Sequence, residues 1–202
     1  MRVRDRILRA VLSEGGNEND ALIAYELESL ALQLSGAMDS AAVVVAGQLN
    51  LPEPNNMISW TRQEPRRTMR TQWEVSTDLT THWKHLTQAM ALVRNRIHGS
   101  PIKSVADGSS QEDNVFLVLP RDARQSLQTL FKRLGGNEAC GLRHDGLLDP
   151  WVFTERAVSE TQTALGQIAG LATRTMVSDT DPDVWPWDAR TTAGTVRLFG
   201  LS

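Results

Sequence analysis

Apolar residues recur at steps of three and four along most of this chain, which is the period of a helix with one buried face. The longest such pattern follows Asp20, a residue type favoured at helix N-caps, and runs to about Leu49. A shorter amphipathic stretch, residues 3–13, precedes it. The apolar positions of the long predicted helix are Leu22, Ile23, Leu27, Leu30, Leu34, Met38, Ala41, Val45 and Leu49.

A second long helix is predicted from about Pro65 to His98, since proline suits the first turn of a helix. Gly99 and Pro101 directly after it are typical of a helix end. The regular spacing of its apolar residues predicts a heptad-like seam, as in an antiparallel helix bundle. This seam consists of Leu79, Trp83, Leu86, Met90, Val93 and Ile97.

The pattern changes after the second helix. Two short runs, IKSVA (102–106) and NVFLVLP (114–120), flank a polar loop and predict a small β-hairpin. Helices are predicted again from Pro120 and from Asp149–Pro150, the latter running to about Met176. The chain is therefore expected to be all-α, an antiparallel bundle of four to five main helices with a small β-hairpin insertion.

The composition agrees with one soluble domain, because 41% of the 202 residues are hydrophobic and 22% are charged. We expect residues 1–176 to form the helical bundle and residues 177–202 to form an acidic, Trp-containing tail that packs on it. The single cysteine, Cys140, excludes an intramolecular disulfide and suits a reducing compartment. The most apolar window, around residues 35–47, is shorter than the roughly 18 residues of a membrane span and contains Asp39. These features predict a cytoplasmic protein without a membrane segment.

Two residues at the end of the second helix carry candidate chemistry. Arg94 and His98 are four residues apart and therefore share a helix face, and Arg94 is about 60° from Ile97 of the apolar seam. Arginine stays charged and binds phosphate, histidine titrates near neutral pH, and the amide of Asn95 can orient either group. An ordinary helix C-terminus is equally compatible with these residues, because cations there interact favourably with the helix dipole.

The segment VRNRIHG, Val93 to Gly99, resembles the signature of the HEPN superfamily. In that signature an Arg, usually followed by a polar residue such as Asn, precedes a His near the end of the third helix of a bundle. The resemblance extends over roughly Ala21 to Gly136, including the long upstream helix and the tryptophan-bearing segment. It implies an all-α, often homodimeric protein that acts as a metal-independent endoribonuclease in toxin–antitoxin or antiphage defence systems.

The resemblance also implies a role for each residue. The ribose 2′-hydroxyl of RNA would attack the adjacent phosphate, with Arg94 stabilising the phosphate charge, Asn95 as its polar companion, and His98 in acid–base catalysis or substrate positioning. No cofactor or metal is required. Three residues separate Arg94 from His98, whereas the usual motif has four to six, and HGSPIK lacks the tyrosine that an adenylylating partner modifies in some HEPN toxins. A catalytically inactive HEPN-like module that binds RNA, nucleotide or a protein partner is therefore the alternative.

A basic segment spans the start of the second helix. It places Arg62, Arg66, Arg67 and Arg70 within nine residues, and with Arg96 these are the candidate RNA-binding residues. They would contact the phosphate backbone, or they would simply form a solvated surface. The expected partners are RNA, a second copy of the chain, and an antitoxin or other defence-system protein. His82 and His85 have the spacing of two metal ligands on a helix, but without a third ligand no metal site is predicted.

Overall fold

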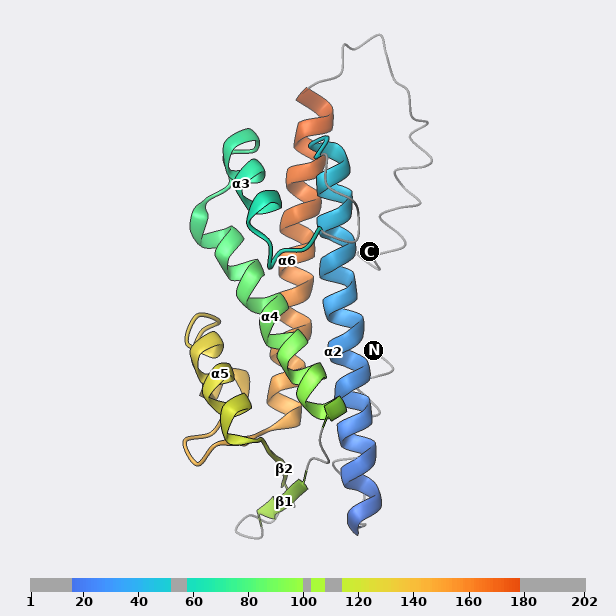
Figure 1. The fold of residues 1–202 in the computed structure, drawn as a ribbon, viewed down its shortest axis with the longest axis vertical. Coiled ribbons are helices and arrows are strands. Elements are labelled where there is room, and N and C mark those ends of the chain that lie inside the picture. The colour runs from blue at the N-terminus through green and yellow to red at the C-terminus, as the bar shows by residue number, and fades with distance from the viewer. Residues whose placement is uncertain (1–15, 52–57, 100–102, 108–113, 179–202) are drawn as a thin grey trace.

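The computed structural model describes residues 16–51, 58–99, 103–107 and 114–178; the side chains of a few residues at helix ends, including Ile97 and His98, lie outside this description. Three long helices form the body of the molecule: α2 (Gly16–Gln48), α4 (Thr77–Gly99) and α6 (Pro150–Ser178). α4 runs antiparallel to both α2 and α6 (Figure 1). The short helices α3 (Gln63–Gln72) and α5 (Arg121–Phe131) lie against α4 near its two ends. The predicted all-α bundle is confirmed.

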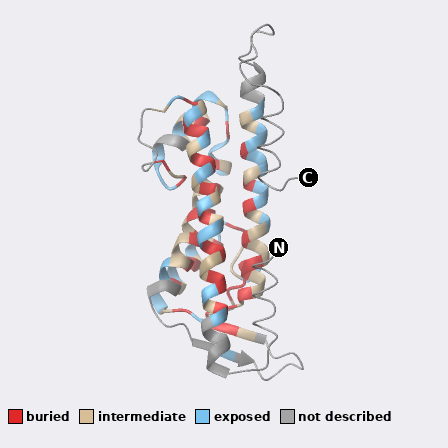
Figure 2. Cartoon of the chain, turned by 90° about the vertical axis from the view of Figure 1, so that its right-hand side faces the viewer, coloured by how far each residue is buried: buried red, intermediate tan, exposed pale blue. Residues whose placement is uncertain are grey.

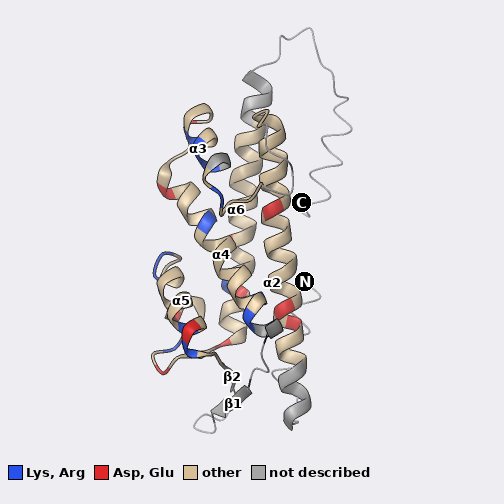
Figure 3. Cartoon of the chain, in the orientation of Figure 1, with Lys and Arg blue, Asp and Glu red and all other residues tan. Residues whose placement is uncertain are grey.

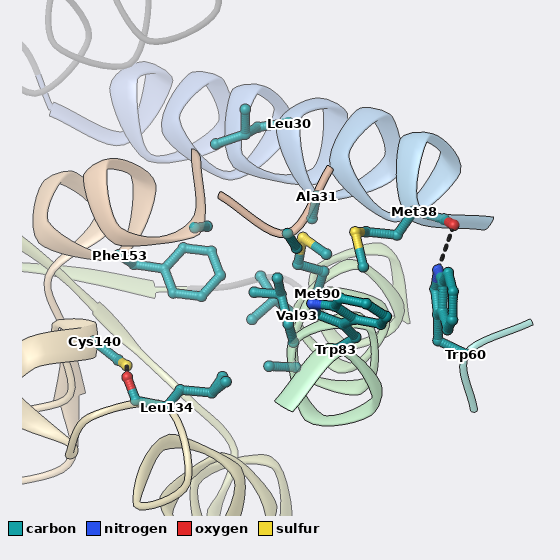
Figure 4. Close-up of a cluster of buried hydrophobic side chains, with 14 of the residues drawn as sticks. Leu30, Ala31, Met38, Trp60, Trp83, Met90, Val93, Leu134, Cys140 and Phe153 are labelled. Carbon is teal, nitrogen blue, oxygen red and sulfur yellow. Dashed lines mark hydrogen bonds between the residues drawn. The ribbon is translucent and has the colours of Figure 1, made fainter. Parts of the chain in front are cut away.

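Two tryptophans link the three long helices. Trp60, from the loop after α2, and Trp83 of α4 pack edge to face with their ring centroids 5.1 Å apart. Trp60 Nε1 donates a 2.7 Å hydrogen bond to the carbonyl of Met38 on α2 (Figure 4). Trp83 Nε1 donates to Gln167 Oε1 on α6 at 3.2 Å. Both indoles are fully buried, so they bury a large apolar area while their polar atoms stay hydrogen-bonded.

The helix predicted from Pro65 to His98 is in fact two helices. α3 ends at Gln72, and α4 begins at Thr77. Between them Glu74 adopts a left-handed backbone conformation (φ 53°), and Ser76 Oγ accepts a 3.1 Å hydrogen bond from the backbone N–H of Leu79. Ser76 therefore caps α4, and a serine in this position stabilises a new helix start rather than a continuous helix.

The start and the buried face of α2 also differ from the prediction. The helix begins at Gly16, so Asp20 is not its N-cap. Most of the predicted apolar positions are buried, but Leu22 is 44% exposed. Figure 2 shows buried and exposed positions alternating along the helices, as expected for helices with one buried side. Leu22 lies on the outward side of α2, because the apolar residues of this helix cover a wider arc than the bundle buries.

The predicted hairpin is present as β1 (Lys103–Asp107) and β2 (Asn114–Val118), which pair antiparallel with Val105 opposite Phe116. A third strand, β3 (Leu147–Leu148), pairs with the other edge of β2 and places Leu148 opposite Leu117. It lies between the helices predicted from Pro120 and from Asp149, where no strand was predicted. A strand of two residues is too short to show a sequence period.

The start of α6 agrees with the prediction. Asp149 Oδ1 accepts hydrogen bonds from the backbone N–H groups of Trp151 and Val152, at 2.9 and 3.0 Å, so it caps the helix. The predicted helix at residues 3–13 lies outside the described residues, and so does the predicted tail, 177–202, apart from its first two residues, which belong to α6.

α2 has the length and composition of a possible membrane span. Within Leu22–Gln48 the mean hydropathy reaches 1.4, so the exclusion of such a segment from the sequence was too strict. In the structure 44% of that window is buried inside the protein, and the core helix of a soluble bundle meets the same criteria.

Candidate functional site at the end of α4

Arg94 and Asn95 lie in the last turns of α4, next to the buried seam residue Val93. Arg94 is half-buried and Asn95 is exposed. The Nε of Arg94 donates a 3.1 Å hydrogen bond to Oδ1 of Asn95, which orients the guanidinium. Within the described part of the chain no acceptor binds its two Nη groups, so they are available to an anion.

His98 follows Arg94 by one helical turn. The backbone of α4 continues through Gly99, so the two residues share a helix face, with about 5–6 Å expected between their Cβ atoms. The side chain of His98 lies outside the described residues. The predicted placement on one face is therefore supported by the backbone of α4.

Arg96 points to the other flank of α4. Two residues advance a helix by about 200°, so Arg94 and Arg96 lie on nearly opposite sides of it. Arg96 Nη2 forms a 2.6 Å ion pair with Oδ2 of Asp122 in the first turn of α5. Both side chains are exposed, so the pair contributes roughly 0–1 kcal/mol. Arg96 thus joins α4 to α5 instead of extending the Arg94 surface.

The arginines predicted to assist Arg94 lie on and beside α3, near the beginning of α4 (Figure 3). Arg66 Nε donates to the carbonyl of Arg62 at 2.8 Å, and Arg70 Nε donates to the carbonyl of Arg66 at 3.1 Å. Arg94 is about 25 Å along α4 from its first residue, at 1.5 Å per residue. The structure does not bring Arg62, Arg66, Arg67 and Arg70 next to Arg94.

A group of cations around the middle of α4 was not predicted. The pKa of His85 is lowered, first by burial and then by the positive charges of Lys84, Arg133, His82 and Arg66. Arg66, Lys84, His85 and Arg133, here called the His85 cluster, therefore bring positive charge together from α3, α4 and the end of α5. From the sequence His85 was considered only with His82 as a metal pair, and Arg66 only with the other arginines of its segment. Arg133 is too distant along the chain for any local pattern to connect it with His85.

His82 contacts α6 instead of a metal. Its Nε2 lies 2.8 Å from Oε2 of Glu160, and Oε1 of the same carboxylate forms a 2.7 Å ion pair with Arg156. Arg156 Nη2 also donates to the carbonyl of Leu134 at 3.0 Å. These contacts tie α4, α6 and the end of α5 together. Among the described residues no three His, Cys, Asp or Glu side chains are grouped as metal ligands.

The interior beside these contacts is nearly filled. A cavity of about 10 Å³ lies between α4, α5 and α6, lined mainly by apolar side chains including Phe131 and Phe153. That volume holds about one water molecule, so it cannot bind a nucleotide. Cys140 borders it, and burial raises the pKa of its thiol to about 11. A nucleic-acid substrate would therefore bind on the surface.

Asp39, the charged residue in the most apolar window of the sequence, is hydrogen-bonded on α2. Its Oδ1 accepts a 2.9 Å hydrogen bond from Ser59 Oγ. This bond joins α2 to the loop that carries Trp60.

Comparison with protein families, characterised proteins and solved structures gives no match to this chain. The resemblance to HEPN proteins therefore depends on the segment Val93–Gly99 and its position in a helical bundle.

Proposed function

We propose that this chain is a HEPN-like, metal-independent endoribonuclease that acts in the cytoplasm as a toxin or antiphage defence effector, controlled by an antitoxin or another defence-system protein. The observation that carries the proposal is the Arg94–Asn95 pair: a half-buried guanidinium oriented by a 3.1 Å hydrogen bond, one helical turn before His98. A pre-oriented guanidinium suits a phosphate, because it loses little freedom on binding and presents two parallel N–H donors.

The chemistry follows from these groups. The ribose O2′ forms a bond to phosphorus while the bond from phosphorus to the 5′-oxygen of the next nucleotide breaks. The O2′ proton passes to a base and the leaving oxygen receives a proton, leaving a 2′,3′-cyclic phosphate and a 5′-hydroxyl. Arg94 would stabilise the additional negative charge on the phosphate oxygens in the transition state. His98 would donate or accept one of the protons, since its ordinary pKa is near neutral.

The positive charge on α3 and along α4 supports RNA as the substrate. Arg62, Arg67 and Arg70 accompany the His85 cluster, and together they supply local positive charge in a chain whose net charge is −3. Binding of a polyanion to such a surface depends on counterion release and weakens with salt. We assign phosphate-backbone contacts to these residues, and to Arg96 when Asp122 releases it.

The test is cleavage of end-labelled RNA by the purified full chain in EDTA. We expect fragments ending in 2′,3′-cyclic phosphate, and loss of cleavage in both Arg94→Ala and His98→Ala. Lys132→Ala, which removes an exposed cation at the far end of α5, serves as the matched control and should retain activity. Cleavage that survives His98→Ala, or that is also lost in Lys132→Ala, would contradict the assignment.

The second candidate is an inactive HEPN-like module that binds RNA. The ion pair of Arg96 with Asp122 and the distance between α3 and Arg94 favour it, because they separate the binding charges from the Arg94–His98 face. Intact RNA with retained, salt-sensitive binding in the same assay would support this candidate over the nuclease.

A further inference from the structure

Positive side chains from α3, α4 and the end of α5 lie close together. The pKa of Arg66 on α3 is lowered, first by burial and then by the charge of Arg70. The pKa of His85 on α4 is lowered as well, first by burial and then by nearby cations that include Arg66 and Arg133. Cations that lower one another's pKa are close enough to repel. In Figure 3 lysine and arginine appear on α3 and on the adjacent part of α4. We call this set the cationic row, and it consists of Arg62, Arg66, Arg70, Lys84 and Arg133.

The cationic row has no carboxylate partner in the described part of the chain. Arg66 Nε and Arg70 Nε donate to backbone carbonyls one turn earlier, which fixes both side chains along α3. Within the described ranges no residue of the row forms an ion pair, whereas Arg96, Arg143 and Arg156 each do. Surface cations that are not neutralised by a neighbour raise the local potential and attract an anionic partner.

The C-terminal tail of the same chain carries the opposite charge. Directly after α6, residues 179–188 read DTDPDVWPWD and contain no lysine or arginine. We call them the acidic segment, and their charged residues are Asp179, Asp181, Asp183 and Asp188. The N-terminal stretch, residues 3–13, has three arginines and one aspartate, so its charge has the same sign as the row. Of the two ends of the chain, the C-terminal one therefore complements the cationic row.

The position where α6 ends brings the acidic segment within reach of the row. α6 ends at the same end of the bundle as α3 (Figure 1). Trp83, the neighbour of Lys84, donates a hydrogen bond to Gln167. Gln167 lies about 17 Å along α6 from Ser178, at 1.5 Å per residue. The ten residues of the acidic segment span up to about 33 Å when extended. Its aspartates can therefore fold back to α3 and to Lys84.

We propose that the acidic segment binds the cationic row of its own chain and covers the surface that would otherwise bind RNA. Carboxylates bind guanidinium groups through the same paired N–H donors that phosphates use. Trp185 and Trp187 lie between the aspartates in sequence, and an indole stacks on arginine as a nucleic-acid base does. The acidic segment thus has the chemical groups of a short single-stranded nucleic acid, with carboxylates in place of phosphates and indoles in place of bases.

Because the segment is tethered, even a weak contact would compete with RNA. A tether of this kind gives an effective concentration of about 1 mM at the site. An intrinsic dissociation constant of about 100 μM would then cover the row in about nine chains of ten and weaken RNA binding about tenfold. This effect on RNA rests on the proposed function, whereas the contact between the acidic segment and the row does not.

Zero-length crosslinking tests the contact without RNA. A carbodiimide joins a carboxylate to a lysine amine in direct contact, and the only lysines of the chain are Lys84, Lys103 and Lys132. Peptide mapping of the full chain should show aspartates of the acidic segment joined to Lys84. Lys103, in β1 at the opposite end of the bundle, is the internal control and should carry no such crosslink. No crosslink to Lys84, or equal crosslinking to Lys103, would overturn the proposal.

Isotope labelling identifies which chain supplies the segment. In a mixture of ¹⁴N- and ¹⁵N-labelled chains, the crosslinked peptide pairs should carry a single label if the segment binds its own chain. Pairs of mixed label in the proportion expected for random exchange would assign the segment to a second copy and overturn the proposal as stated.

RNA binding tests the consequence of the contact. Asp181→Asn/Asp183→Asn should raise the affinity of the full chain for a 2′-deoxy oligonucleotide about threefold to tenfold, because it weakens the tethered competitor. Glu112→Gln/Asp113→Asn, in the connection between β1 and β2, changes the net charge equally and should have a smaller effect. Equal gains in the two double variants would mean that net charge alone acts and would overturn the masking of RNA. Crosslinks to Lys84 in a chain that binds no oligonucleotide would support the contact and contradict the proposed function instead.

Discussion

Arg96 of α4 and Asp122 of α5 form a 2.6 Å ion pair on the flank of α4 opposite Arg94. Two arginines only two residues apart thus have different environments. Arg94 is oriented by Asn95 and open to an anion, whereas Arg96 is neutralised by a carboxylate at the start of the next helix. RNA that bound Arg96 would have to displace Asp122.

We expect Asp122→Asn to strengthen RNA binding, because it frees Arg96 and removes a negative charge that repels the phosphate backbone. One more phosphate contact should steepen the dependence of log K on log salt by about 0.7 for single-stranded RNA. Fluorescence anisotropy at several salt concentrations measures both effects. Glu138→Gln, which removes an exposed acid from the 3-10 turn at Glu138–Cys140, is the control. Equal gains in the two variants would mean that net charge alone is responsible and that Arg96 makes no contact.

We expect the pKa of His85 to rise when RNA binds. In the free protein this pKa is lowered, first by burial and then by the cations of the His85 cluster and by His82. Phosphates that neutralise Lys84, Arg133 and Arg66 would remove part of that repulsion. NMR titration of the His85 ring protons, with and without a 2′-deoxy oligonucleotide that cannot be cleaved, measures the shift. The exposed His144 provides an internal reference. An unchanged His85 titration with bound oligonucleotide would show that nucleic acid binds elsewhere.

The thiol of Cys140 should contribute to stability below pH 9 and lose that contribution as the pH rises from about 9 to 11. Burial raises its pKa from 9.0 to about 11 in the folded chain, so the folded state holds the thiol proton more tightly than the unfolded state does. Urea unfolding of the wild type and of Cys140→Ala at several pH values between about 9 and 11 measures this pH dependence of stability. As the pH rises from about 9 to 11, the unfolding free energy of the wild type should fall relative to that of Cys140→Ala. A constant difference would contradict the raised pKa.

Trp60→Phe should destabilise the chain by about 1–3 kcal/mol. The substitution removes the 2.7 Å hydrogen bond to the carbonyl of Met38 and leaves a gap where the larger, fully buried indole lay. Trp83→Phe should cost less through its hydrogen bond, because the acceptor Gln167 is exposed and can bind water. Chemical denaturation measures the unfolding free energy of each variant, and an unchanged m-value means that the two losses can be compared directly. Equal losses would mean that ring packing dominates and the Trp60 hydrogen bond contributes little.

Much of the helical architecture follows from local pattern. The seam of α4 was predicted because a 3.6-residue period is visible without any knowledge of the partner helix, and Trp83, Leu86, Met90 and Val93 are all buried. The cap of α6 at Asp149 was predictable for the same reason, since capping involves only adjacent backbone groups.

The errors arose where a local pattern allowed two outcomes. The residues on both sides of the break between α3 and α4 are compatible with one helix, and the chain turns there because Ser76 caps α4 and Val75 is buried in the core. Leu22 was assigned to the core because an apolar residue beside a seam continues the pattern. Periodicity gives the direction of a buried face, but neighbouring helices set its width.

The sequence by itself determined the helices, the hairpin, and the one-turn spacing of Arg94 and His98, because each depends on residues close together along the chain. Only the tertiary structure decided which charges meet. It paired Arg96 with Asp122, gathered Arg66 and Arg133 around His85, and left apolar side chains of α2 such as Leu22 and Tyr25 exposed. The physical reason is that these relationships depend on how the helices pack, and packing joins residues that no local period connects.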